Sequence, residues 1–143
     1  MRQRALTGAA YVALGALIAL GPQFVFAICD QTEHGVTTCF WTARAELGVG
    51  GAAAALGLLV ILLGRTPGVC AGLSAAFAVN GVLALLLPDV LIGVCEHPHM
   101  ACRLATLPAL NLIGALAALL GAANAARLLK KSGKGGKTDG DRA

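Results

Sequence analysis

Four cysteines bracket two short polar stretches of this chain, and thiols placed in this way can form disulfides, exchange them or bind a metal ion. Cys29 and Cys39 bracket the first stretch, and Cys95 and Cys102 bracket the second. Exposed cysteine pairs in an oxidising compartment usually end as structural disulfides. We therefore favour two staples, Cys29–Cys39 and Cys95–Cys102, although four cysteines allow three pairings and the sequence leaves all three open.

A membrane thiol–disulfide oxidoreductase is the first alternative. Small membrane oxidoreductases with four helices also carry outward cysteines, but a redox site of that kind is expected to use a Cys-x-x-Cys pair. Here Cys39 follows Cys29 by ten positions, and Cys102 follows Cys95 by seven. These spacings are not typical of a redox motif, so the sequence favours structural cysteines.

Metal binding at the second polar stretch is the other alternative. His97, His99 and Met100 lie between Cys95 and Cys102. Thiolate, imidazole and thioether groups suit copper or zinc, but cysteines that are oxidised to a disulfide cannot also be ligands. Because a short tract rich in ligands is only a compositional signal, we expect no cofactor and treat these residues as candidate ligands on the outer face.

The composition indicates a membrane protein. Of the 143 residues, 57% are hydrophobic and only 13% are charged, whereas about a quarter of the residues in a soluble domain are charged. Four apolar runs are long enough to cross a bilayer, and in lipid such runs must satisfy their own backbone groups, which predicts helices. The runs cover roughly residues 6–28, 41–64, 68–94 and 103–129. The sequence thus predicts an all-α membrane protein with four transmembrane helices.

These helices should form two tandem hairpins, because one pattern occurs twice. Pro22 precedes Cys29 by the same spacing as Pro88 precedes Cys95, and each copy continues with a polar stretch, a second cysteine and a long apolar run. The two copies are 66 positions apart at these residues. The first apolar run is also longer than the core of a usual signal peptide, so we expect it to be an uncleaved helix.

The positions of Lys and Arg predict the orientation. Most of them fall on one side of a four-span arrangement: Arg2, Arg4, Arg65, Arg127, Lys130, Lys131, Lys134, Lys137 and Arg142. The positive-inside rule makes this side cytoplasmic, so we expect a multi-pass protein of the cell membrane with both termini in the cytoplasm. Residues 1–131 would form the membrane domain and residues 132–143 a flexible cationic tail. The net charge of +4 is then a topology signal, and we expect no nucleic-acid partner.

A shallow polar layer should lie inside the membrane below the outer cysteines. At about 1.5 Å per residue, Gln23, Glu46 and Asp89 lie at similar depth, and Arg44 lies near them. Because charged residues inside a span tend to face a bundle interior or a watery cavity, we expect Glu46 to meet Arg44, Asp89, Gln23 or freed backbone groups. Glu46→Leu would then lower stability. The alternative is a layer that only sets the helix register near the interface.

Prolines and asparagines mark further positions in the predicted helices. Pro22 and Pro88 each remove a backbone hydrogen bond, so they should kink the outer ends of the first and third helices. Freed carbonyls beside them could line a small polar pocket. Asn80 and Asn111 lie deeper, where we expect side-chain hydrogen bonds between helices.

The motifs around the cysteines resemble those of a known family. They are Gly21-Pro-Gln23, Cys39-x-Trp-Thr-Ala-x-Ala-Glu-Leu-Gly48, Leu91-Ile-Gly-Val-Cys95, Met100-x-Cys102 and Thr106-Leu-Pro108. Over most of residues 5–129 the chain resembles the small prokaryotic membrane proteins catalogued as domain of unknown function 4418. The resemblance implies a four-span protein, an association with transport machinery and no known activity. In that family a histidine often follows the motif cysteines, where this chain has Phe40 and Arg103, which further disfavours a metal site.

These features together predict a non-enzymatic integral membrane protein of the prokaryotic cell membrane. We expect an accessory or interaction subunit with disulfide-stapled outer loops above the polar layer. Its expected partners are the lipid bilayer and either another membrane protein or a second copy of the chain.

Overall fold

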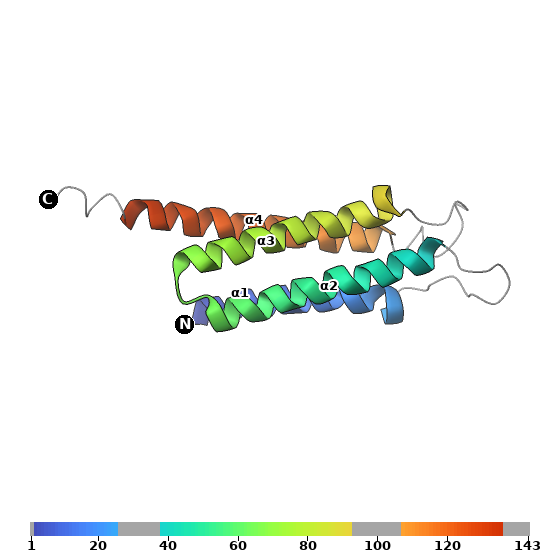
Figure 1. The fold of residues 1–143 in the computed structure, drawn as a ribbon, viewed down its shortest axis with the longest axis horizontal. Helices are drawn as coiled ribbons and strands as arrows, with labels where there is room; N and C mark the ends of the chain where they lie inside the picture. Colours follow the sequence, from blue (N-terminus) through green and yellow to red (C-terminus); the bar gives the residue numbers. More distant parts are fainter. Residues whose placement is uncertain (1, 26–37, 93–106, 136–143) are drawn as a thin grey trace, which may run out of the picture.

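The structure, a computed structural model, describes residues 2–25, 38–92 and 107–135. These residues form four α-helices whose axes are roughly aligned (Figure 1). They are α1 (Arg2–Leu20), α2 (Thr38–Leu63), α3 (Pro67–Leu86) and α4 (Leu107–Gly135). Two π-helical turns, η1 (Gly21–Val25) and η2 (Leu87–Leu91), extend α1 and α3. The predicted all-α class is therefore confirmed.

All four helices are long and apolar enough to cross a membrane. The qualifying segments are Gln3–Leu20, Phe40–Leu63, Pro67–Leu91 and Leu107–Ser132. Large apolar side chains such as Leu62, Val79 and Leu119 are exposed on their surfaces. Such a surface suits hydrocarbon rather than water, and the chain is an integral membrane protein with several spans.

The helices pair as two antiparallel hairpins, α1 with α2 and α3 with α4, which lie side by side (Figure 1). One end of the bundle holds the start of α1, the end of α2, the start of α3 and the last turns of α4. We call it the basic end, because Arg4, Arg65, Arg127 and Lys131 lie there. The opposite end holds η1 and η2, and we call it the π-helix end. The predicted arrangement of two hairpins is confirmed.

Glycines allow the two helices of each hairpin to approach closely. A Cβ atom added at Gly50 on α2 would lie 2.6 Å from the carbonyl oxygen of Gly15 on α1. A Cβ atom added at Gly81 on α3 would lie 3.0 Å from the carbonyl oxygen of Gly114 on α4. No side chain fits at these positions, so backbone packs directly on backbone, as small residues permit in membrane helices.

Aromatic stacking and a hydrogen bond join the two hairpins. The rings of Tyr11 on α1 and Phe77 on α3 stack with their centroids 3.8 Å apart and their planes 7° from parallel. The side-chain amide of Asn80 on α3 donates to the carbonyl of Val49 on α2 at 2.9 Å, which is the inter-helix hydrogen bond predicted for Asn80. Smaller buried residues complete this core: Ala53, Val60, Cys70 and Ala117.

Pro22 and Pro88 lie in the π-helical turns. Proline lacks a backbone N–H, and in an α-helix its ring clashes with the carbonyl four residues earlier. A π turn changes the local spacing of the hydrogen bonds, and in η2 the N–H of Ile92 donates to the carbonyl of Leu87 at 3.0 Å. Pro22 and Pro88 are both fully buried, so the predicted kinks take the form of π turns that face the bundle.

α4 extends further than the sequence indicated. It continues to Gly135, beyond Lys131, after which we expected a flexible tail. The added segment, residues 132–135, contains no proline that would break the helical hydrogen bonds. Residues 136–143 lie outside the described part of the chain.

The glycine contacts predict opposite outcomes at two neighbouring positions of α2. Gly50→Val would push a side chain into the backbone of α1 and should cost about 1–3 kcal/mol through overpacking. An added Cβ at Gly51 would meet no atom within 4 Å, so Gly51→Val is the matched control. Thermal melting in detergent should show a lower Tm for Gly50→Val alone. Equal melting of the two variants would contradict the direct packing of α1 on α2.

Candidate functional site

Most of the cysteines and candidate metal ligands fall outside the described residues, namely Cys29, Cys95, His97, His99, Met100 and Cys102. For Gln23 in η1 and Cys39 in α2, only the backbone is described. Within residues 2–25, 38–92 and 107–135, no three His, Cys, Asp or Glu side chains gather closely enough to hold a metal ion. The disulfides and the metal site therefore stay predictions.

Glu46 points into the bundle at the π-helix end. Its side chain is completely buried, and it lies one helical turn before Gly50, on the face of α2 that packs against α1. Among the described residues, neither of its carboxyl oxygens has a hydrogen-bond partner. Burying a polar group without a partner is unfavourable, so Glu46 lowers the stability of the isolated chain.

The other charged residues of the expected polar layer lie on the surface. Arg44 is exposed, and its guanidinium lies 5.2 Å from the centre of the Phe40 ring, within range of a cation–π contact. Asp89 in η2 is also exposed and accepts a hydrogen bond of 3.0 Å from the side-chain amide of Asn111 on α4. This bond between elements is the role predicted for Asn111. The structure thus brings Asp89 to Asn111, and it shows no hydrogen bond from Glu46 to Arg44 or Asp89.

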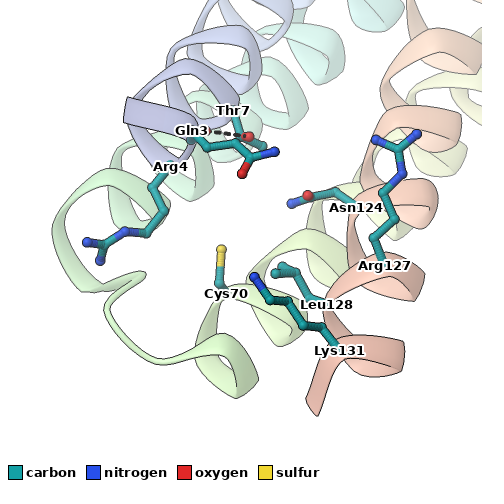
Figure 2. Close-up of a pocket in the computed structure, with 8 residues that line it drawn as sticks. All are labelled: Gln3, Arg4, Thr7, Cys70, Asn124, Arg127, Leu128 and Lys131. Carbon is teal, nitrogen blue, oxygen red and sulfur yellow. Dashed lines mark hydrogen bonds between the residues drawn. The ribbon is translucent and has the colours of Figure 1, made fainter. Parts of the chain in front are cut away.

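A second group of polar side chains surrounds a hollow at the basic end (Figure 2). This hollow, which we call the basic pocket, has a volume of about 210 Å³. In Figure 2 the Cys70 thiol, the Asn124 amide and the Lys131 amine point into the space between α1, α3 and α4. The lining residues are Gln3, Arg4 and Thr7 from α1, Cys70 from α3, and Asn124, Arg127, Leu128 and Lys131 from α4.

Hydrogen bonds hold the walls of the basic pocket. The Arg4 guanidinium donates to the carbonyl of Gly64 at 2.8 Å, which satisfies a backbone acceptor just past the end of α2. The side-chain amide of Asn124 donates to the Ser74 hydroxyl at 2.8 Å, and that hydroxyl donates to the carbonyl of Cys70 at 2.8 Å. α1 is thereby tied to α2, and α4 to α3, around the hollow.

Positive charge at this end is uncompensated within the described part of the chain. Arg65 lines an adjoining hollow of about 590 Å³, which we call the side lobe and which shares Arg4 and Lys131 with the basic pocket. Among the described residues, no carboxylate lines either hollow. Guanidinium and ammonium groups form their strongest hydrogen bonds with anionic oxygens, so this arrangement can hold an anion.

Sequence reasoning missed the basic pocket because the positive-inside rule already explained its cations. Gln3, Thr7 and Asn124 belong to no recognisable motif. The sequence offered one indication of the pocket, because these three polar residues lie near the same end of the predicted spans. That signal cannot show which helix faces meet, and only the packing of α1, α3 and α4 brings these side chains around one hollow.

Glu46 faces inward as expected, but it has no hydrogen-bond partner among the described residues, which reverses the stability effect expected from the sequence. Glu46→Leu removes two unpaired buried oxygens, so it should stabilise the protein by about 1–3 kcal/mol, the usual penalty for such a group. Glu46→Gln keeps buried polar atoms and should gain less. Thermal melting of the three proteins in detergent measures the order.

Leu110 provides the matched control for this series. It is buried on α4 four residues before Gly114, as Glu46 is buried on α2 four residues before Gly50. Leu110→Gln should lower the Tm, because it buries a new amide without a partner. A Glu46→Leu variant that melts below the wild type would show that the carboxyl group has a stabilising partner after all.

The comparison with known proteins agrees with the membrane fold described above. The family described as Domain of unknown function (DUF4418) matches residues 11–126, which include the greater part of all four helices. No curated protein and no solved structure matches the chain. The matched range covers Tyr11, Glu46, Asp89 and Asn124, and so includes residues from both ends of the bundle. On this match the chain belongs to the DUF4418 family.

Proposed function

We propose that this protein is an accessory subunit that binds a membrane partner through the outward face of α2. The observation that carries the proposal is the open space at Gly48 and Gly51. A Cβ atom added at either glycine would meet nothing within 4 Å. Ala52 and Ala55 are exposed on the same part of α2. We call these four residues the small-residue face.

α2 uses other small residues for its own hairpin. Added Cβ atoms at Gly50 and Gly57 would collide with the backbone of α1, and Ala53 is buried in the core. The small-residue face is therefore not needed for the packing of α1 on α2. It offers two small-xxx-small patterns, Gly48-x-x-x-Ala52 and Gly51-x-x-x-Ala55, to a neighbour outside the bundle.

A transmembrane helix is the partner that fits this face. Between membrane helices there is no hydrophobic driving force, so association depends on close packing, which small residues allow. The face lies within the uncharged part of the span Phe40–Leu63, where only another apolar helix or lipid can contact it. This supports an interaction subunit, and a second copy of the chain is the competing occupant.

Bulky substitutions on the small-residue face should therefore release the partner. We expect Gly48→Ile with Gly51→Ile to lose a membrane protein that co-purifies with the tagged wild type in mild detergent. Gly72→Ile on α3 is the matched control, because an added Cβ there also meets nothing within 4 Å. Its co-purifying proteins should match those of the wild type in mass spectrometry.

Two measurements keep this test specific. All variants should melt like the wild type, since the substituted positions are open in the fold. Co-purification of a differently tagged copy of the same chain, lost in the double variant, would identify self-association instead. Identical partners for the double variant and Gly72→Ile would contradict docking on α2.

We also propose that the two hairpins derive from one duplicated unit. Tyr11 and Phe77, which stack on each other, are 66 positions apart, as are Gly15 and Gly81, which face the partner helices of their own hairpins. The same separation relates Pro22 to Pro88. Equivalent residues therefore have equivalent roles in packing, which supports the tandem repeat read from the sequence.

The proposed orientation puts the basic end in the cytoplasm and the stapled loops outside. Its support is the gathering of Arg4, Arg65, Arg127 and Lys131 at one end of the bundle, which the positive-inside rule assigns to the cytoplasm. We expect alkaline phosphatase, which is active only outside the cytoplasm, to be inactive when fused after Ala143 and active when inserted at Thr37. Activity of the Ala143 fusion would overturn this orientation.

A further inference from the structure

We propose that the basic end binds an anionic phospholipid, with its phosphate in the basic pocket and one acyl chain along the surface between α1 and α4. This site is separate from the small-residue face of α2 and does not depend on the proposed partner. The charge of the pocket, its depth in the membrane and an apolar groove that continues from it carry the proposal.

The charge of the basic pocket suits a phosphate group. Arg127 and Lys131 line it from α4, and within the described part of the chain no carboxylate competes for them. Arg4 also lines the hollow, but its guanidinium donates to the Gly64 carbonyl and points away from the Cys70 thiol (Figure 2).

The depth of the pocket matches the headgroup region of a bilayer. Its lining includes Gln3, where the first candidate span begins, and Lys131, next to the end of the fourth span at Ser132. Lipid phosphates lie at the boundary between hydrocarbon and water. Basic pockets between membrane helices at this level are a recurrent way of binding anionic headgroups.

A groove between α1 and α4 is the reason for proposing a lipid rather than a free phosphate ion. This hollow has a volume of about 310 Å³ and shares Thr7, Asn124 and Arg127 with the basic pocket. Leu6 and Leu120 are exposed along it. Ala10, Tyr11 and Ala123 complete its apolar wall. An acyl chain can cover this surface, whereas an inorganic ion cannot use it.

Lipid selectivity is the first test. The purified full-length protein in detergent is melted with added phosphatidylglycerol, phosphatidylcholine or sodium phosphate, because a ligand of the folded state raises the Tm. We expect phosphatidylglycerol to raise the Tm at concentrations where phosphatidylcholine and sodium phosphate do not. Equal shifts with phosphatidylcholine would overturn the site for an anion. Equal shifts with sodium phosphate would overturn the lipid and leave a phosphate site.

Two adjacent lysines test the position of the headgroup. Lys131 lines the basic pocket and the side lobe, whereas Lys130 is exposed and lines neither. Lys131→Gln should raise the phosphatidylglycerol concentration for half-maximal stabilisation about fivefold, the usual effect of one cation near an anionic lipid. Lys130→Gln, which makes the same change in net charge, should leave it unchanged. Equal effects of both variants would indicate non-specific attraction and overturn the site.

Two adjacent alanines test the acyl-chain groove. Ala123 lines the groove, and Ala122 is exposed without lining any of the three hollows. Ala123→Phe should fill the groove and abolish most of the stabilisation by phosphatidylglycerol, while Ala122→Phe should retain it. Both variants should melt like the wild type without lipid, because both positions are on the surface. Full stabilisation of Ala123→Phe by phosphatidylglycerol would overturn the acyl-chain part of the proposal.

Discussion

The direct contact of glycine backbones within each hairpin is the interaction on which the rest of this structure depends. Where α1 crosses α2 at Gly15 and Gly50, no side chain separates the two helices. In lipid there is little hydrophobic driving force between helices, so close packing of this kind holds them together. The contact also fixes the rotation of α2 about its axis. Glu46, one turn from Gly50, must therefore face inward, while Gly48 and Gly51 face outward.

The two ends of the bundle differ in their charged groups: one buries a carboxyl group, and the other gathers cations around a hollow. At the π-helix end the carboxyl group of Glu46 is buried without a hydrogen-bond partner among the described residues. At the basic end, Arg127 and Lys131 surround a hollow that no described carboxylate lines. Each arrangement is unfavourable or incomplete in the isolated chain, because a buried polar group lacks a partner in one case and like charges gather in the other. The hollow at the basic end is open to an outside ligand, whereas the Glu46 side chain at the other end is completely buried.

The two helices of each hairpin pack against each other more extensively than the two hairpins pack together. The contacts of α1 with α2 and of α3 with α4 are extensive, those of α2 with α3 are fewer, and α1 and α4 contact only sparsely. The stacked rings of Tyr11 and Phe77 fill the centre of the interface between the hairpins, and the edge between α1 and α4 stays open as a groove. The weaker packing between the hairpins thus leaves an open groove between α1 and α4.

The sequence alone determined the helical class, the four spans, the pairing into hairpins and the family, because apolar run length and segregated charge depend only on the order of residues. It also predicted that Asn80 and Asn111 bond between helices. The rotation of each helix was decided only in the tertiary structure, because glycine-to-glycine contacts between segments far apart in sequence set it. With that rotation, Arg44 lies on the surface, Glu46 is buried with no hydrogen-bond partner among the described side chains, and Gln3, Asn124 and Lys131 line one hollow.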